Sequence, residues 1–176
     1  YAISADFKDA WFIRDIVKSN GDSFPSDFTA ICKYVKNPSG IIGYVDEKHD
    51  GIPVDFTDVI LSGPLVSEKV MKVFKNFVTD KDVQFIPVTF VNFNNEVYYL
   101  MNVLKNINCL DVKKTTFFIN DYAKNIVLVN SKIHNTPVFR VLDGIINNYI
   151  YVNSSIKEAL EAAYTTGAKK IDIDVI

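Results

Sequence analysis

The chain has 176 residues, of which 48% are apolar and 23% charged, a composition that excludes a disordered chain and can supply one sizeable core. Its net charge of −2 argues against a nucleic-acid binder, which carries clustered Lys and Arg. No apolar run approaches the roughly 20 residues that span a bilayer. We therefore expect one domain over residues 1–176, with neither nucleic acid nor membrane as partner.

The two cysteines, Cys32 and Cys109, have neither metal-ligand spacing nor the numbers of a disulfide framework. Reduced thiols of this kind are typical of a cytoplasmic protein. The apolar neighbours of Cys109 further indicate a small buried side chain rather than a nucleophile.

The first third of the chain alternates short apolar runs with turn-forming residues, which is typical of strands. We expect strands at residues 29–35, 41–45 and 59–61, and a strand or the start of a helix at residues 11–13. Between the second and third of these, residues 46–50 place three carboxylates in five positions. With one more aspartate before the third strand, they form the predicted partner-binding residues Asp46, Glu47, Asp50 and Asp58.

The pattern becomes helical after residue 66, where apolar residues recur at spacings of three and four up to Phe77 while lysines occupy the other side. Ser67 is a suitable N-cap, and Glu68 suits the positive end of the helix dipole. The sequence therefore predicts a helix that begins after Ser67 and buries Phe74.

A β-hairpin is predicted next, because two apolar runs at residues 83–91 and 97–104 flank Asn94-Asn95, and asparagine tolerates the positive φ of a tight turn. Both faces of the first run are largely apolar, so we expect this strand to be covered on both sides and central in its sheet. Pro87 cannot donate a ladder hydrogen bond, which predicts a bulge or an unpaired position there.

The last third contains strand patterns at residues 115–119, 126–129, 138–142 and 149–152. Ser155 and Glu158 fit a capping box, predicting a second helix that Gly167 ends. Residues 170–176 then alternate as in an edge strand. The predicted fold class is α+β, a single domain with a mainly antiparallel β-sheet, a central hairpin and two packed helices.

Candidate chemical groups are few. His49 and His134 have no further ligand-type residue at helical or hairpin spacing, so we expect surface histidines. Asp111, Asp172 and Asp174 could form a carboxylate site, with a divalent cation if they meet in one pocket, although a solvated face is the simpler interpretation. The sequence has neither a glycine-rich phosphate loop nor a nucleophile elbow. We expect no metal and no cofactor.

The order and spacing of several segments resemble a family of bacterial immunity proteins from polymorphic toxin systems, formerly described as a domain of unknown function. The resemblance covers roughly residues 41–176 and is strongest from Val83 onward. The segments that carry it are Pro-Val-Asp-Phe-Thr (53–57), Leu-Val-Ser-Glu-Lys (65–69), Tyr-Tyr-Leu-Met-Asn-Val (98–103), Cys-Leu-Asp (109–111), Val-Phe-Arg (138–140) and Tyr-Val-Asn-Ser-Ser-Ile-Lys-Glu-Ala-Leu (151–160).

This resemblance implies a cytoplasmic, non-catalytic antidote that binds a cognate toxin domain. Two alternatives stay open from the residues alone: an enzyme built on the three aspartates, and an accessory domain without a toxin partner. For recognition, the acidic residues around position 50 would complement a basic toxin surface. Asp55 stands apart from them, because it lies inside the Pro-Val-Asp-Phe-Thr segment and could instead cap or tie the local fold.

Overall fold

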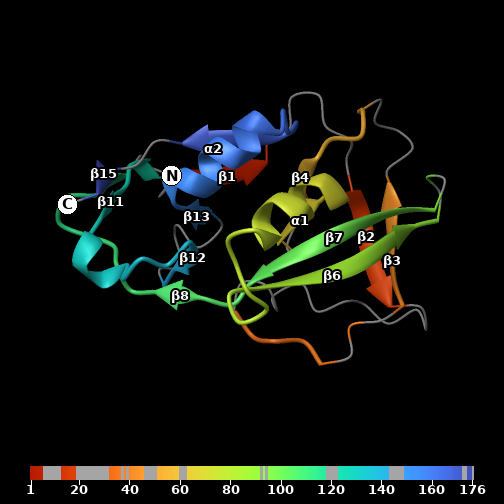
Figure 1. Cartoon of the computed structure of the whole chain (residues 1–176), viewed down its shortest axis with the longest axis horizontal. Coiled ribbons are helices and arrows are strands. Elements are labelled where there is room, and N and C mark those ends of the chain that lie inside the picture. Colours follow the sequence, from red (N-terminus) through yellow and green to blue (C-terminus); the bar gives the residue numbers. More distant parts are fainter. Residues whose placement is uncertain are drawn as a thin grey trace.

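The computed structural model describes residues 1–5, 13–18, 32–36, 38, 40–45, 51–59, 63–91, 93, 95–117, 123–142, 149–171 and 174–175. Two β structures lie side by side, a closed barrel on the right of Figure 1 and a five-stranded sheet on the left. Both helices lie between them. The fold is α+β with mainly antiparallel pairing, as the sequence predicts.

The barrel has the strand order β2-β3-β6-β7-β5-β4 and closes where Ile13 of β2 pairs with Val59 of β4. Neighbouring strands are antiparallel except at β3–β6 and β2–β4. Closure gives each of these strands a paired neighbour on both sides over part of its length. They are β2 (Ile13–Lys18), β3 (Ile41–Val45), β4 (Phe56–Val59), β5 (Gly63–Val66), β6 (Val83–Phe90) and β7 (Glu96–Val103).

The predicted hairpin is confirmed as β6 and β7, which pair from Val83–Val103 to Phe90–Glu96, with Asn95 at a φ of 55°. It is central, because β6 also pairs with β3. Of the two alternatives predicted at Pro87, a bulge or an unpaired position, the bulge is wrong, because Pro87 pairs with Tyr99 in an unbroken register. The described pairing with β3 begins only at Val88, so Pro87 stands where one side of β6 has no paired strand.

Side chains of alternate residues fill the barrel. Its interior packs residues of β2, β3, β5, β6 and β7 around Phe90 and Tyr98, whose rings meet edge to face with centroids 5.9 Å apart. Gly43 is required there, since a Cβ at that position would overlap the ring of Phe90.

The second sheet has the order β14-β1-β13-β12-β8, antiparallel except at β12–β8. Strand β14 is at an edge, as expected for this segment. Of the strand expected over residues 170–176, residues 170–171 belong to β14, and residues 174–175 form β15, which pairs in another sheet. The sheet contains β1 (Ala2–Ala5), β8 (Asn106–Ile107), β12 (Val138–Val141), β13 (Ile150–Val152) and β14 (Ala168–Ile171). Outside this sheet, β9 (Thr116–Phe117) pairs with β10 (Ala123–Asn125), and β11 (Val127–Leu128) pairs with β15 (Asp174–Val175).

Helix α1 (Glu68–Lys75) begins as predicted, with the Ser67 side chain accepting the N–H of Val70 at 3.4 Å. It buries Val70, Met71 and Phe74 in a core that also contains residues of both β structures and of helix α2 (Ser154–Ala162). This shared core joins the barrel to the five-stranded sheet. The burial of Phe74 is confirmed, and α2 buries Ile156 and Leu160.

The start and end of α2 differ from the prediction. The N-cap is Asn153, whose Oδ1 accepts the N–H of Ile156 at 3.0 Å, and Ser155 lies inside the helix. The predicted capping box is therefore wrong, because an asparagine two residues earlier takes the capping position. The helix ends before Tyr164, which has a φ of 51°, and Gly167 lies beyond it, against the backbone oxygen of Phe56.

The strand predicted at residues 29–35 is also wrong in its described part, where residues 32–35 form no strand. Side chains hold this segment instead. The amide of Gln84 accepts the N–H of Val35 at 2.9 Å and donates to its carbonyl oxygen at 2.7 Å, while Asn102 donates to the carbonyl of Lys33 at 2.8 Å. Gln84 and Asn102 are cross-strand partners, so two neighbouring buried amides of the hairpin hold this segment through its backbone.

Candidate functional site

Three of the four predicted partner-binding residues, Asp46, Glu47 and Asp50, lie outside the described residues, and Asp58 is described only through its backbone in β4. The strands that flank these residues in the chain, β3 and β4, are described. Ile13 pairs both with Val45, which immediately precedes Asp46, and with Val59, which immediately follows Asp58. The ends of β3 and β4 next to the predicted residues therefore meet at one end of the barrel.

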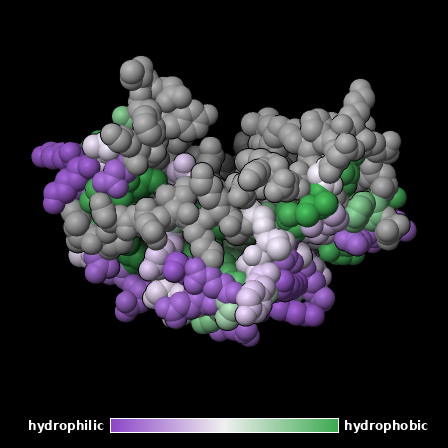
Figure 2. Space-filling model, turned by 90° about the horizontal axis from the view of Figure 1, so that it is seen from above, coloured by the Kyte–Doolittle hydropathy of each residue, from purple (hydrophilic) through white to green (hydrophobic). Residues whose placement is uncertain are grey.

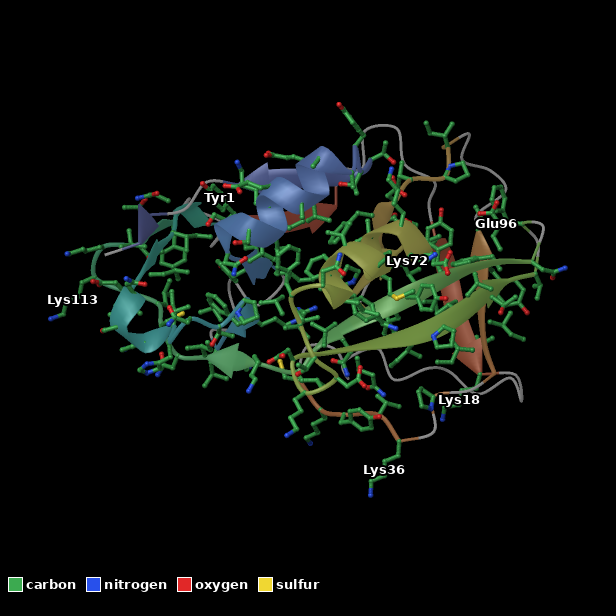
Figure 3. All side chains as sticks on the ribbon, in the orientation of Figure 1. Tyr1, Lys18, Lys36, Lys72, Glu96 and Lys113 are labelled. Atoms are coloured by element: carbon green, nitrogen blue, oxygen red, sulfur yellow. The ribbon has the colours of Figure 1, made fainter. Side chains whose placement is uncertain are left out.

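The tip of the central hairpin lies at the same end. Strand β3 runs parallel to β6, so the end of β3 at Val45 and the end of β6 at Phe90 point the same way. Glu96 pairs with Phe90 and is exposed. Figure 3 shows Glu96 at one end of the barrel and Lys18, the last residue of β2, at the other. We call the end that carries Val45, Val59 and Glu96 the hairpin end.

Asp55, which the sequence set apart, ties three segments together. Its carboxylate accepts the hydroxyl of Ser67 at 2.7 Å, the Lys69 ammonium at 3.1 Å, and the N–H and hydroxyl of Thr166 at 3.1 and 3.2 Å. Its backbone N–H donates to Thr166 Oγ1 at 3.0 Å. These contacts join the start of β4 to the start of α1 and to the turn after α2. The expectation that Asp55 ties the local fold is confirmed.

The ionisation of Asp55 reflects these bonds. Burial on its own raises the pKa of the Asp55 carboxyl, but hydrogen bonds from Ser67, Thr166 and Lys69, with the charge of Lys69, outweigh it and hold the pKa below its ordinary value. Asp55 is therefore a charged structural anchor at neutral pH.

The alternative carboxylate site is described only at Asp111. Its side chain accepts the N–H groups of Lys113 and Lys114 at 3.1 and 3.2 Å, which is an Asx turn. Asp172 and the side chain of Asp174 are outside the described part. Among the residues that the structure describes, no three His, Cys, Asp or Glu side chains gather as metal ligands.

The cysteines and the described histidine occupy structural positions. Cys109 is buried, and burial raises the pKa of its thiol to about 11, which keeps it protonated and unreactive at neutral pH. Burial also raises the pKa of Cys32, although the positive charge of Arg140 opposes this rise. His134 lies at φ 48° in an exposed turn, and His49 is outside the described residues.

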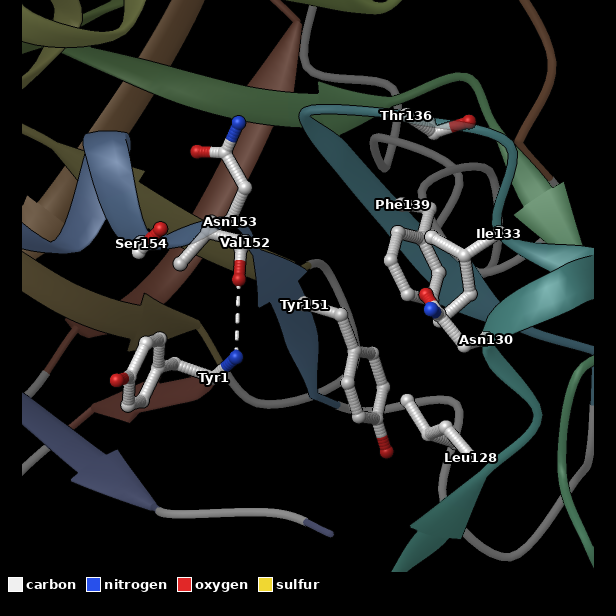
Figure 4. A pocket seen from close by; sticks show the side chains of 10 residues that line it. All are labelled: Tyr1, Leu128, Asn130, Ile133, Thr136, Phe139, Tyr151, Val152, Asn153 and Ser154. Carbon is white, nitrogen blue, oxygen red and sulfur yellow. Dashed lines mark hydrogen bonds between the residues drawn. The ribbon is translucent and has the colours of Figure 1, made fainter. Parts of the chain in front are cut away.

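A cavity of about 600 Å³ lies on the sheet half of the molecule. Its floor includes Phe139 and Tyr151, whose rings stack with centroids 5.3 Å apart. Figure 4 shows Tyr1, Asn153 and Ser154 on one side and Asn130, Ile133 and Thr136 on the other. The described side chains that line this cavity are uncharged. Sequence patterns did not predict the cavity, because its lining comes from three distant parts of the chain.

The two helices contain 8 and 9 residues, and none in the described ranges is long and apolar enough to span a membrane. A model described as "Immunity protein family (Imm11)" matches residues 8–174. The chain belongs to this immunity protein family, as the resemblance predicted. No curated protein matches it.

Proposed function

We propose that this chain is a cytoplasmic immunity protein that binds one cognate toxin domain and neutralises it by covering the toxin's working surface, without catalysis of its own. The match of the family model over residues 8–174 carries this proposal. The roles of Asp111 and Cys109 support the non-catalytic part, because the carboxylate of Asp111 closes a turn and the thiol of Cys109 is buried.

We further propose that the toxin is recognised at the hairpin end through Asp46, Glu47, Asp50 and Asp58. The placement of Val45 and Val59 in one row with Ile13 supports this, since the chain segments that carry these acidic residues leave the barrel at the same end. Glu96 adds a described carboxylate there. A toxin that acts on nucleic acid needs a basic cleft, and an acidic surface would attract and block such a cleft.

Growth tests the neutralisation. The toxin domain encoded beside this chain is expressed in a bacterial host with the chain, with an unrelated immunity protein, or alone. We expect growth to be restored only by the cognate chain. Growth arrest in the presence of the correctly folded cognate chain would refute the proposed function.

A charge reversal tests the recognition residues. The double variant Asp46→Lys, Glu47→Lys is compared with Asp80→Lys, Glu158→Lys, which changes the net charge equally at two exposed positions on other segments. We expect the first pair to slow association with the toxin about tenfold or more at low salt, and to flatten its salt dependence. Equal association rates for both variants would place recognition elsewhere.

A further inference from the structure

Four strands of the barrel present one aligned row of side chains on the outside. Val17 of β2 pairs with Ile42 of β3, Ile42 pairs with Thr89 of β6, and Thr89 pairs with Val97 of β7. Residues that pair in register point to the same face of a sheet. The row therefore crosses four neighbouring strands on a single face.

This row is on the solvent side. Ile41, Val88 and Phe90, which alternate with it, are buried in the barrel interior. Val97 is 44% exposed, and Val17, Ile42 and Thr89 are half-buried. One step along the hairpin, exposed Pro87 pairs with half-buried Tyr99 on the same face. Tyr99 marks the border of this face, because its side chain also packs against the core that α1 and α2 share. We name these six residues the open barrel face: Val17, Ile42, Pro87, Thr89, Val97 and Tyr99.

The same outer face of the hairpin is covered further from its tip. There Val83, Met101 and Val103 are buried in the core that α1 and α2 share, and the ring of Phe85 lies 6.4 Å from that of Phe74. The helices thus cover only part of this face, and the part toward the tip stays accessible. Figure 2 shows apolar atoms, in green, reaching the surface on the barrel half, among hydrophilic ones.

The open barrel face adjoins the hairpin end. Val97 follows Glu96 in β7, and β3 runs from Ile42 in the row to Val45, after which the chain continues into Asp46 and Glu47. An apolar centre beside a charged margin is the arrangement of protein–protein interfaces. Because this margin is negatively charged and the centre is apolar, they favour a partner surface that is apolar at its centre and basic at its edge.

We propose that the open barrel face is the apolar centre of the toxin interface, with the exposed carboxylate of Glu96 at its charged margin. This inference rests on the proposed function and adds the surface and the chemistry of the partner: a folded toxin domain that presents an apolar patch beside its basic groups. Apolar contact would provide most of the affinity, while the acidic margin would mainly speed association.

The test places a long charged side chain at the centre of the face. Val97→Arg is compared with Val112→Arg, because both valines are exposed, at 44% and 66%, and Val112 lies after Asp111, outside the barrel. We expect Val97→Arg to raise the Kd for the purified cognate toxin domain about 30-fold or more. Val112→Arg should leave it within about threefold of the unaltered value, a range that separates near-neutral contacts from hot spots.

Footprinting of the unaltered chain keeps the inference falsifiable if Val97→Arg folds poorly. Hydroxyl radicals should modify Tyr99 less in the complex than in the free chain, while Tyr164, which is 86% exposed and follows α2, keeps its reactivity. Wild-type affinity of a folded Val97→Arg variant, or an unchanged Tyr99, would overturn the inference and leave the proposed function standing. Failure of the unaltered chain to bind the toxin would overturn both.

Discussion

Asp55 and Thr166 bind each other through three hydrogen bonds although 111 residues separate them in the chain. A fourth bond, from the N–H of Phe56 to the carbonyl of Thr166 at 3.0 Å, extends the contact. Asp55 precedes a barrel strand, and Thr166 precedes the edge strand of the five-stranded sheet. This pair thus ties the two β structures at the surface, beside the apolar core that joins them inside.

Replacing Asp55 by Asn should therefore destabilise the protein. Hydrogen bonds to a charged group contribute about 1.5–3 kcal/mol, and the exposed ion pair with Lys69 adds little, so we expect a loss of about 2 kcal/mol in the free energy of unfolding. Urea unfolding measures it. Asp80→Asn, at an exposed position, serves as control and should change stability by less than about 0.5 kcal/mol. Equal effects of the two variants would contradict the anchoring role.

The lowered pKa of Asp55 also predicts a pH dependence. A carboxyl whose pKa is lower in the folded than in the unfolded chain contributes stability above the unfolded pKa, about 3.9, and loses it as pH falls through the folded value. Asp82 acts in the same direction, because hydrogen bonds from Thr79 and the charge of Lys105 outweigh burial and lower its pKa. We expect the stability difference between the unaltered chain and Asp55→Asn to be constant above about pH 5 and to shrink below about pH 4.

Replacing the N-cap of α2 separates the observed cap from the predicted capping box. Asn153→Ala should lower the free energy of unfolding by about 1 kcal/mol, because the N–H of Ile156 loses its acceptor. Ser155→Ala should have almost no effect, since Ser155 is an exposed residue within the helix. Denaturant midpoints measure both changes in stability. A larger loss of stability for Ser155→Ala than for Asn153→Ala would support the predicted capping box instead.

Two phenylalanines near the end of α1 make a matched pair for the shared core. Phe74 is fully buried, whereas Phe77 is 37% exposed and lies after the helix. Phe74→Ala should cost about 3–5 kcal/mol by opening a cavity between the barrel and the five-stranded sheet. Phe77→Ala should cost clearly less in the same denaturant titration. Equal and small losses of stability for both variants would mean that the shared core does not depend on the buried face of α1.

Local patterns predicted the elements whose signals lie close together in sequence. The hairpin follows from alternating apolar residues around Asn94-Asn95, and α1 from its apolar spacing and Ser67. Barrel closure was not predictable in this way, because the pairs Ile13–Val59 and Ile42–Thr89 join segments with no shared pattern. The same holds for the open barrel face, whose row appears only once four strands are in register.

Single residues show a similar limit. The sequence indicated that Asp55 could tie the local fold, but it did not indicate the partners Ser67, Lys69 and Thr166, which lie 12, 14 and 111 residues away. The capping box at Ser155 and Glu158 was a valid local pattern, but Asn153 accepts the N–H of Ile156 and begins the helix two residues earlier. Asp46, Glu47, Asp50 and Asp58 stay a prediction from charge and chain position.

The stoichiometry of inhibition tests the central claim most directly. The purified cognate toxin domain is titrated with this chain, in the presence and absence of a chelator, and residual toxin activity is measured after equilibrium. A protein that acts by binding and covering the toxin should abolish activity at one equivalent of chain per toxin, equally with and without chelator. Full inactivation at a small fraction of an equivalent, or a requirement for a divalent cation, would instead indicate catalysis and contradict the account.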